Sequence, residues 1–487
     1  MRPWLSRTLI GVGVFGACWI GVLWYWNATR RMPATSDVVL WLVLLPLLLL
    51  VGLWALRKLA SGVAAARAAA AAAAAAAAQA GVAAAPVAAA PSTLTVLAGA
   101  LRMPHGDDAR MLTEALLSRQ ANLQLDPELL DERGYPILAG RAEDVDVAAQ
   151  QDSMADWLQQ HHPDAFLSDE QWRALALGTA VAAELASELV PHPALPDYLD
   201  ALAARKPLPP LPALQLLALL PAEWAAAERA AGADWLRVVI SQYGWPFERI
   251  SIQVPAPGPA PLIALDALAA QAARTDQPFL CLLLACDSRI GESSVQAWAD
   301  QAILLDSRHP DGRVPGEGAA GLLLADRVQG ALFDAPEAAV LYPSAGGVRA
   351  TSADARGRID PAVLAQGAGD LLAKAGLVPE AVTLVSADSD ARASRVGETM
   401  AMASAMLPEL DPASQVLSVA AACGDAGDAS LVAALVLAQQ HVRAGLGAAL
   451  CVSNLDPFQR SVALLAPQTL AQQVPASATD AAQAAAA

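Results

Sequence analysis

The sequence has few residues of the kinds that build disulfide frameworks or zinc sites. Its five cysteines are scattered without Cys-x-x-Cys spacing, which excludes a disulfide framework and favours a reduced, cytoplasmic setting. Its six histidines include one adjacent pair, His161 and His162, and no zinc-ligand pattern. We therefore expect no metal site and no cofactor.

Basic residues are also scarce. The chain has 31 Lys and Arg against 48 Asp and Glu, a net charge of -17. Such a chain repels a polyanionic backbone, so we expect no nucleic-acid partner and favour a partner with a basic surface.

Long apolar runs are present, in contrast, near the amino terminus. Two uncharged runs, Thr8 to Trp26 and Val38 to Leu56, are each close to the length of a membrane-spanning helix. A cleaved signal peptide is the alternative for the first run, but no A-x-A site follows it. Basic residues flank both outer ends, so residues 1–60 are predicted to form a transmembrane hairpin with both ends in the cytoplasm.

Low-complexity segments lie on either side of the remaining chain. Residues 61–92 are rich in alanine and are either a helical stalk from Ala64 to Ala80 or a spacer; both interpretations stay open. Residues 471–487 are predicted to be a disordered tail.

The body between them carries mixed signals for strands and helices. "LTVLAGALRM", "WLRVVISQYG", "FLCLLLACDS" and "AGLLLAD" are predicted strands that alternate with helices such as "PAPLIALDALAAQAAR". The fold class is therefore α/β, with a sheet covered on both faces. The proline-dense stretch from Lys206 to Pro212 is predicted to be an extended linker or domain seam, with a docking motif as the alternative. We expect an amino-terminal α/β domain over 93–234 and a second domain over 235–470.

Gly316, Gly318 and Gly321 have the spacing of a dinucleotide-binding fingerprint. Such a fingerprint must follow a strand and open a helix. Here polar turn residues precede the glycines and an apolar strand follows them. The context is inverted, so we expect a close approach of backbone into a buried strand rather than a nucleotide.

The stretch "DGRVPGEGAAGLLLAD" resembles the segment that leads into a core strand of β-ketoacyl synthases and the wider thiolase-like superfamily. "FLCLLLACDSRIGESSVQAWADQAILL" is similar to the strand and helix that carry "GGvDS" there. The segments around "SADSDARASRVGE" and "AAACGDAGDAS" fall where that family has its two histidines. The resemblance covers roughly Trp235 to Pro467, so the second expected domain, 235–470, is predicted to be thiolase-like. It implies a layered, thiolase-like α/β/α fold and a homodimer or a pseudo-symmetric heteromeric contact.

The family's catalytic residues do not carry over. The resemblance implies a nucleophilic cysteine at the start of "PAPLIALDALAAQAAR", where this chain has Pro259, Ala260 and Pro261. Asp388 stands near the first expected histidine and Asp425 at the second. An ionised carboxylate repels a developing oxyanion. We therefore assign no catalytic residue, no cofactor-binding residue and no metal ligand, and expect a pseudoenzyme.

Two further interpretations concern residues near these positions. Cys423, beside Asp425 and Asp428, is a candidate substitute nucleophile, but no histidine or lysine lies nearby in sequence to lower its pKa. Asp388 and Asp390 together with Arg395 are more simply a polar loop with a local ion pair.

A second resemblance covers the whole arrangement. The membrane hairpin, the alanine-rich stalk, "LAGALRMPHGDD" and "LDPELLDERGYPILAGRAEDV", ahead of a degenerate ketosynthase-like half, are similar to the bacterial family of type VI secretion lipase adaptor proteins. That resemblance implies an inner-membrane protein whose cytoplasmic body binds a lipase effector, or a component of the secretion spike, and assists loading. The alternatives are an acyl-thioester enzyme at the membrane and an acyl-carrier binding module.

Overall fold

The computed structural model describes residues 92–468, apart from 132, 144, 256–260, 275–276, 334 and 336. The predicted hairpin over 1–60 and tail over 471–487 lie outside the described residues, as does the predicted stalk or spacer over 61–92 apart from residue 92. Within the described part, no helix combines the length and the apolar character needed to cross a bilayer.

The described chain runs through two successive sets of elements. The first set is β1 Leu94–Arg102, α4 Ala109–Leu117, β2 Gln124–Leu130, β3 Pro136–Ala139, α5 Val147–His161, α6 Asp169–Ser187, α7 Ala194–Ala203, β4 Leu214–Leu219, α8 Ala226–Gln242, β5 Ile250–Gln253, α9 Pro261–Arg274, β6 Leu280–Ser288, α10 Glu292–Asp300, β7 Glu317–Ala325 and α11 Arg327–Gly330. The second is β8 Ala339–Val348, α12 Ala362–Ala375, β9 Val382–Ala387, α13 Ala393–Met406, α14 Pro412–Gln415, β10 Val416–Ser418, α15 Val419–Cys423, α16 Asp428–Arg443, β11 Ala448–Ser453 and β12 Gln459–Pro467. Two single turns of 3-10 helix, Phe247–Arg249 and Pro379–Ala381, precede β5 and β9.

Ten of the strands form one mixed sheet in the order β10-β9-β11-β12-β8-β1-β7-β6-β4-β5. The two sets contribute five strands each, and each set follows the same order from the edge to the centre of the sheet. In the first set, β4 pairs in parallel with β5 and β6, and β7 is antiparallel to β6 and β1. In the second set, β9 pairs in parallel with β10 and β11, and β12 is antiparallel to β11 and β8. β1 and β8 join the sets by antiparallel pairing. The body is therefore a structural duplication.

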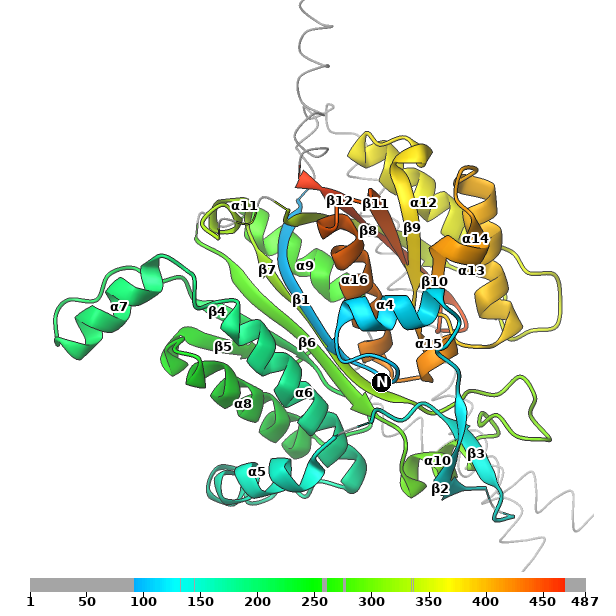
Figure 1. Cartoon of the computed structure of the whole chain (residues 1–487), viewed down its shortest axis with the longest axis horizontal. Helices are drawn as coiled ribbons and strands as arrows, with labels where there is room; N and C mark the ends of the chain where they lie inside the picture. Colours follow the sequence, from blue (N-terminus) through cyan, green and yellow to red (C-terminus); the bar gives the residue numbers. More distant parts are fainter. Residues whose placement is uncertain are drawn as a thin grey trace, which may run out of the picture. The chain divides into compact units, whose positions relative to one another are not determined.

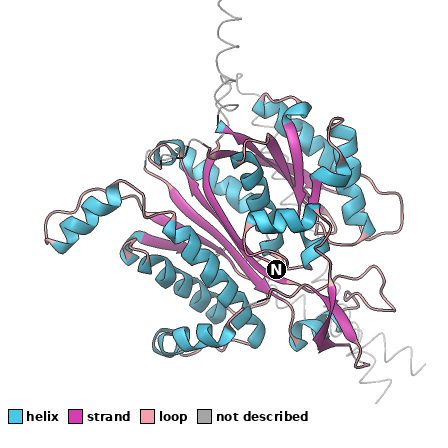
Figure 2. Cartoon of the chain, in the orientation of Figure 1, coloured by secondary structure: helices cyan, strands magenta, loops and turns pink. Residues whose placement is uncertain are grey.

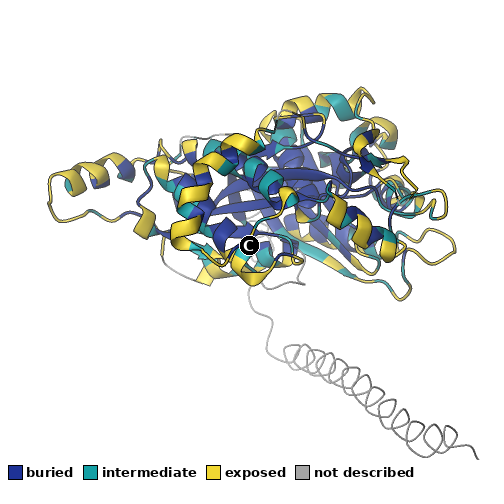
Figure 3. Cartoon of the chain, turned by 90° about the horizontal axis from the view of Figure 1, so that it is seen from below, coloured by how far each residue is buried: buried dark blue, intermediate teal, exposed yellow. Residues whose placement is uncertain are grey.

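The apolar cores place helices in three layers around this sheet (Figures 1 and 2). α16 is the central helix, because its buried residues share one core with inward side chains of both halves of the sheet. α5, α6 and α8 cover the outer face of the first half, and α12 and α13 cover that of the second. Figure 3 shows the buried strands enclosed by helices whose outer faces are exposed.

The expected close approach at the glycines is confirmed. Gly318 and Gly321 lie in β7, which is buried throughout. A Cβ at Gly321 would come within 2.7 Å of the Leu283 carbonyl oxygen, and one at Gly318 would overlap Met103. These positions exclude larger side chains because neighbouring strands and side chains fill the space.

One predicted strand is wrong. "WLRVVISQYG" belongs to α8, because Ala231, Trp235, Leu236, Val239 and Ile240 fall on one buried helical face. The β-branched residues of this stretch suggested a strand, and packing against the sheet decides for a helix.

The predicted division at residues 234 and 235 does not separate two bodies. It falls inside α8, and β1 pairs with β7 and β8 across it. The described residues from 92 to 468 belong to one compact unit. The stretch from Lys206 to Pro212 belongs to neither a helix nor a strand, and it connects α7 to β4 within that unit, so it is not a domain seam.

Candidate functional site

A cavity of about 380 Å³ lies where the two halves of the duplication meet. The starts of the two equivalent helices, Pro261 of α9 and Asp428 of α16, both line it. Asp388, which follows β9, and Asp425, which precedes α16, line it as well. The cavity thus brings together the described positions at which the ketosynthase resemblance places a nucleophile and two histidines.

Asp388 is held at the end of β9 by the neighbouring strand β11. Its carboxylate accepts hydrogen bonds from the Ser453 hydroxyl at 2.7 Å and from the Asn454 backbone N–H at 2.8 Å. The side chain is only 3% exposed. Burial raises the pKa of Asp388 to about 6, although these two hydrogen bonds oppose the change.

Asp425 sits in a tight turn between α15 and α16. Its Oδ1 accepts from the Gly427 N–H at 3.0 Å, and its Oδ2 lies 3.4 Å from an Arg313 nitrogen. Gly424 and Gly427 have φ angles of 76° and 56°, which other residues rarely adopt. A Cβ at Gly427 would also overlap the Asp287 carboxylate. The glycines therefore allow the turn to carry Asp425 into the cavity.

The rest of the lining is strongly acidic. The carboxylates are Glu223, Asp287, Asp388, Asp425, Asp428 and Asp456, whereas the guanidinium groups are Arg289 and Arg313 alone among the described lining residues. Asp287 and Arg289 pair at 2.9 Å, and burial raises the pKa of Asp287. Asp428 reaches solvent through the cavity; desolvation by the surrounding protein, and then the nearby Asp287 carboxylate, raise its pKa.

Cys423 does not take part in this cavity. Its thiol is fully buried and donates to the Pro104 carbonyl oxygen at 3.2 Å. Burial raises the pKa of Cys423 to about 12, so the group is a neutral thiol at physiological pH. This geometry gives no support to a role as substitute nucleophile.

The loop after β9 contains local ion pairs, but the partners differ from the expected ones. Asp390 pairs with Arg392 at 2.8 Å, and Arg395 pairs with Asp354 at 2.8 Å. Asp388 forms no ion pair with any described residue; its partners are the Ser453 hydroxyl and the Asn454 backbone N–H.

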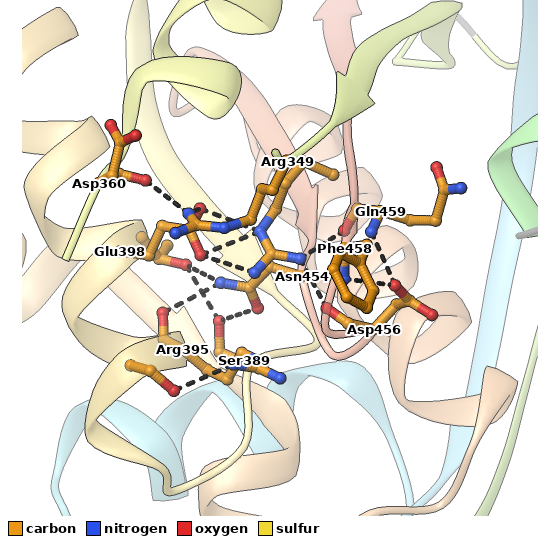
Figure 4. A network of polar contacts seen from close by, with 12 residues as sticks. Arg349, Asp360, Ser389, Arg395, Glu398, Asn454, Asp456, Phe458 and Gln459 are labelled. Atoms are coloured by element: carbon orange, nitrogen blue, oxygen red, sulfur yellow. Dashed lines mark hydrogen bonds and ion pairs between the residues drawn. The ribbon is translucent and has the colours of Figure 1, made fainter. Parts of the chain in front are cut away.

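A buried polar network holds this loop against α13 and β12 (Figure 4). The Glu398 carboxylate forms ion pairs with Arg349 at 2.6 Å and with Arg460 at 2.9 Å. All three side chains are at most 9% exposed. Asn454 accepts from the Ser389 hydroxyl at 2.8 Å and donates to the Arg395 carbonyl oxygen at 3.0 Å. Because Asn454 also binds Asp388 through its backbone, the network fixes the position of that carboxylate.

Sequence reasoning identified Asp388 and Asp425 but missed other lining residues, among them Glu223, Asp287 and Asp456. The sequence could have indicated Asp287, because it is the aspartate of "CDS" in the segment similar to "GGvDS" of the ketosynthases. Glu223 and Asp456 lie in loops after β4 and β11 and have no motif around them. Over the described residues, no cluster of three or more His, Cys, Asp or Glu side chains is arranged to hold a metal ion.

The arrangement of the sheet and its helices is a ketosynthase-like, thiolase-like fold. The ketosynthase from module 6 of the bacillaene synthase of Bacillus subtilis 168 is similar, with a TM-score of 0.50 and 13% identity over 77% of this chain and 72% of that chain. A variant of the same domain gives a TM-score of 0.50 and 11% identity over the same shares. The ishigamide ketosynthase/chain length factor gives 0.49 and 14% identity over 77% and 99%.

The similarity to these structures defines the fold of the body and no more, because the identities are low. It covers more of the chain than the predicted thiolase-like region, 235–470. No protein-family model matches the sequence, and no curated protein matches it.

Proposed function

We propose that this chain is a non-catalytic binding protein that uses a ketosynthase-like body as a scaffold for a protein partner. The observation that carries the proposal is the cavity containing Pro261, Asp388 and Asp425. Where the resemblance places a nucleophile and two oxyanion-binding histidines, these residues supply a saturated ring and two carboxylates. The sequence has no cysteine between Cys18 and Cys281 that could replace the nucleophile.

The charge of the cavity argues against condensation of acyl thioesters. With a pKa of about 6, Asp388 is ionised at neutral pH and destabilises negative charge on a thioester oxygen. The lining has six carboxylates against two guanidinium groups, which disfavours a phosphate-bearing acyl carrier. A binding role requires neither the nucleophilic cysteine nor the two histidines that this chain lacks at the family's catalytic positions.

The partner that we propose is the one implied by the adaptor resemblance: a lipase effector of type VI secretion, bound on the cytoplasmic side of the inner membrane. The net charge of -17 favours a partner surface with basic groups. Binding at the membrane would let the adaptor hold the effector until it is loaded.

The first test is catalysis. Purified full-length chain in detergent is incubated with radiolabelled malonyl and acyl thioesters, beside an active ketosynthase as the positive control. We expect neither carbon dioxide release nor acyl transfer to the protein above the no-protein blank. Stoichiometric acylation of the chain would overturn the non-catalytic assignment.

The second test is the partner. A tagged full-length chain is recovered from its native host, and the proteins that co-purify are identified and then reconstituted from purified components. A lipase-like effector or a spike component that binds directly supports the proposal. An acyl carrier protein that binds instead refutes the adaptor role and favours lipid metabolism.

A further inference from the structure

The proline-dense segment between α7 and β4 is anchored at both ends and free between them. At its start, the Lys206 and Arg205 backbone N–H groups bond to Ala201 and Leu202 at the end of α7. This is a helix-terminating pattern, with Arg205 at a φ of 54°. At its other end, Leu211 is 3% exposed in the outer core, and its carbonyl oxygen accepts from Arg249.

The four residues between these anchors, Pro207 to Pro210, make no hydrogen bond to any described part of the chain. Proline fixes its own φ near -65° and restricts the residue before it to extended conformations. Three of the four are prolines, and Leu208 precedes one. The segment is therefore restricted to extended conformations such as the polyproline II helix, whose backbone carries no internal hydrogen bonds.

Part of the burial pattern has the three-residue repeat of a polyproline II helix, although Leu208 is exposed and Leu211, three residues later, is buried. Pro207, Pro210 and Ala213 are exposed, whereas Pro209 is half-buried and Pro212 is buried. Leu208 is 48% exposed. Pro207 and Pro210 thus form one open edge that faces solvent. Figure 1 shows α7, which the segment follows, extending away from the other helices.

Two cations precede this edge in a chain with a large negative charge. Arg205 and Lys206 are both exposed, and no described carboxylate lies within ion-pair distance of either one. A basic residue directly before Pro-x-x-Pro is complementary to a groove that has acidic groups at one end.

We propose that Arg205 to Pro210 is a docking segment for a partner domain with an aromatic-lined, acid-rimmed groove that recognises polyproline II helices. Pro207 and Pro210 would occupy adjacent aromatic pockets, Leu208 would contact the groove between them, and the two cations would meet the acidic rim. Little conformational entropy is lost on binding, because the prolines already hold the extended form. This surface is distinct from the acidic cavity and does not depend on its function.

The test uses a purified SH3 domain that selects Pro-x-x-Pro ligands preceded by a basic residue. Full-length chain in detergent is immobilised, and binding of the domain is measured by interferometry. A variant of the domain without the groove tryptophan is the negative control. We expect saturable binding of the intact domain and none of its variant.

The chain variants separate recognition from general adhesion. P207A/P210A and, separately, R205E/K206E are expected to weaken binding at least about tenfold, and higher salt is expected to weaken binding of the wild type but not of R205E/K206E. P209A is the matched control, because this proline faces the body, and it is expected to bind within about twofold of wild type. Circular dichroism confirms that each variant is folded.

Two results would overturn the proposal. One is the absence of saturable binding by the wild-type chain, which would mean that the segment is not presented as a ligand. The other is equal binding by P207A/P210A and P209A, which would mean that the exposed edge is not what the domain recognises.

Discussion

The pH dependence of stability offers a direct test of how deeply Asp388 is buried. Its pKa is about 6 in the folded chain against 3.8 for an ordinary aspartate, and burial is the cause. The folded state therefore keeps the proton to a higher pH than the unfolded state does. The stability that this preference adds is fully present below pH 3.8 and is lost as the pH rises through about 6.

The structure gives the size of this effect. A difference of about two pKa units corresponds to about 3 kcal/mol in the free energy of unfolding, of which about 2 kcal/mol falls between pH 4 and pH 7.5. Asp388→Asn has nearly the same shape, and its amide can still meet Ser453 and the Asn454 N–H, but it does not titrate. We expect the wild type to lose about 2 kcal/mol more than Asp388→Asn over this range.

The assay is urea unfolding followed by tryptophan fluorescence at a series of pH values and at low protein concentration, because the isoelectric point is about 4.7. Asp370→Asn is the matched control, since this carboxylate is exposed on α12, and the variant is expected to unfold with the pH dependence of the wild type. Identical pH dependence in wild type and Asp388→Asn would show that Asp388 titrates normally and would refute its burial in the cavity wall.

Three further predictions concern the surroundings of the cavity. Glu398→Gln leaves Arg349 and Arg460 buried without their counter-charge, and we expect a loss of about 3–5 kcal/mol in urea unfolding; an unchanged midpoint would contradict the network. Gly140→Ala places a Cβ on the carbonyl oxygen of Cys423, so we expect a loss above about 4 kcal/mol, seen as a lower melting temperature. Cys423 should resist iodoacetamide at pH 8 until the chain is unfolded, as measured by mass spectrometry of its peptide; rapid labelling of native protein would show that the thiol is accessible.

Local patterns predicted the interior of the fold better than its topology. β6 and β7 are runs of apolar residues bounded by polar turns, and they are buried over their whole length. α8 was mistaken for a strand because its second half is rich in β-branched residues, and only its packing on α6 and β5 identifies the helical face. The duplication of the strand order involves pairings between distant segments, such as β1 with β8, for which the sequence has no local signal.

The site was predictable only in part for a related reason. Asp388 and Asp425 were found because they stand in segments that resemble a known family. Glu223 and Asp456 come from separate loops, and they reach the cavity only after the two halves of the sheet have come together. An ordinary acidic residue in a loop gives no indication of such a position, since most loop carboxylates are solvated.

The position of the carboxylates in the fold bears on the proposal that the chain is not a catalyst. The starts of α9 and α16 meet at the cavity, and the amino terminus of a helix stabilises negative charge. In an acyl-transfer enzyme that field is available to a thiolate and a developing oxyanion. Here Asp425 and Asp428 place fixed carboxylates at the start of α16. Desolvation and the nearby Asp287 carboxylate raise the pKa of Asp428, which opposes the effect of the helix. A thiolate or an oxyanion at this point would be repelled by the carboxylates that already stand there. This repulsion supports the proposal that the chain is a scaffold rather than a catalyst.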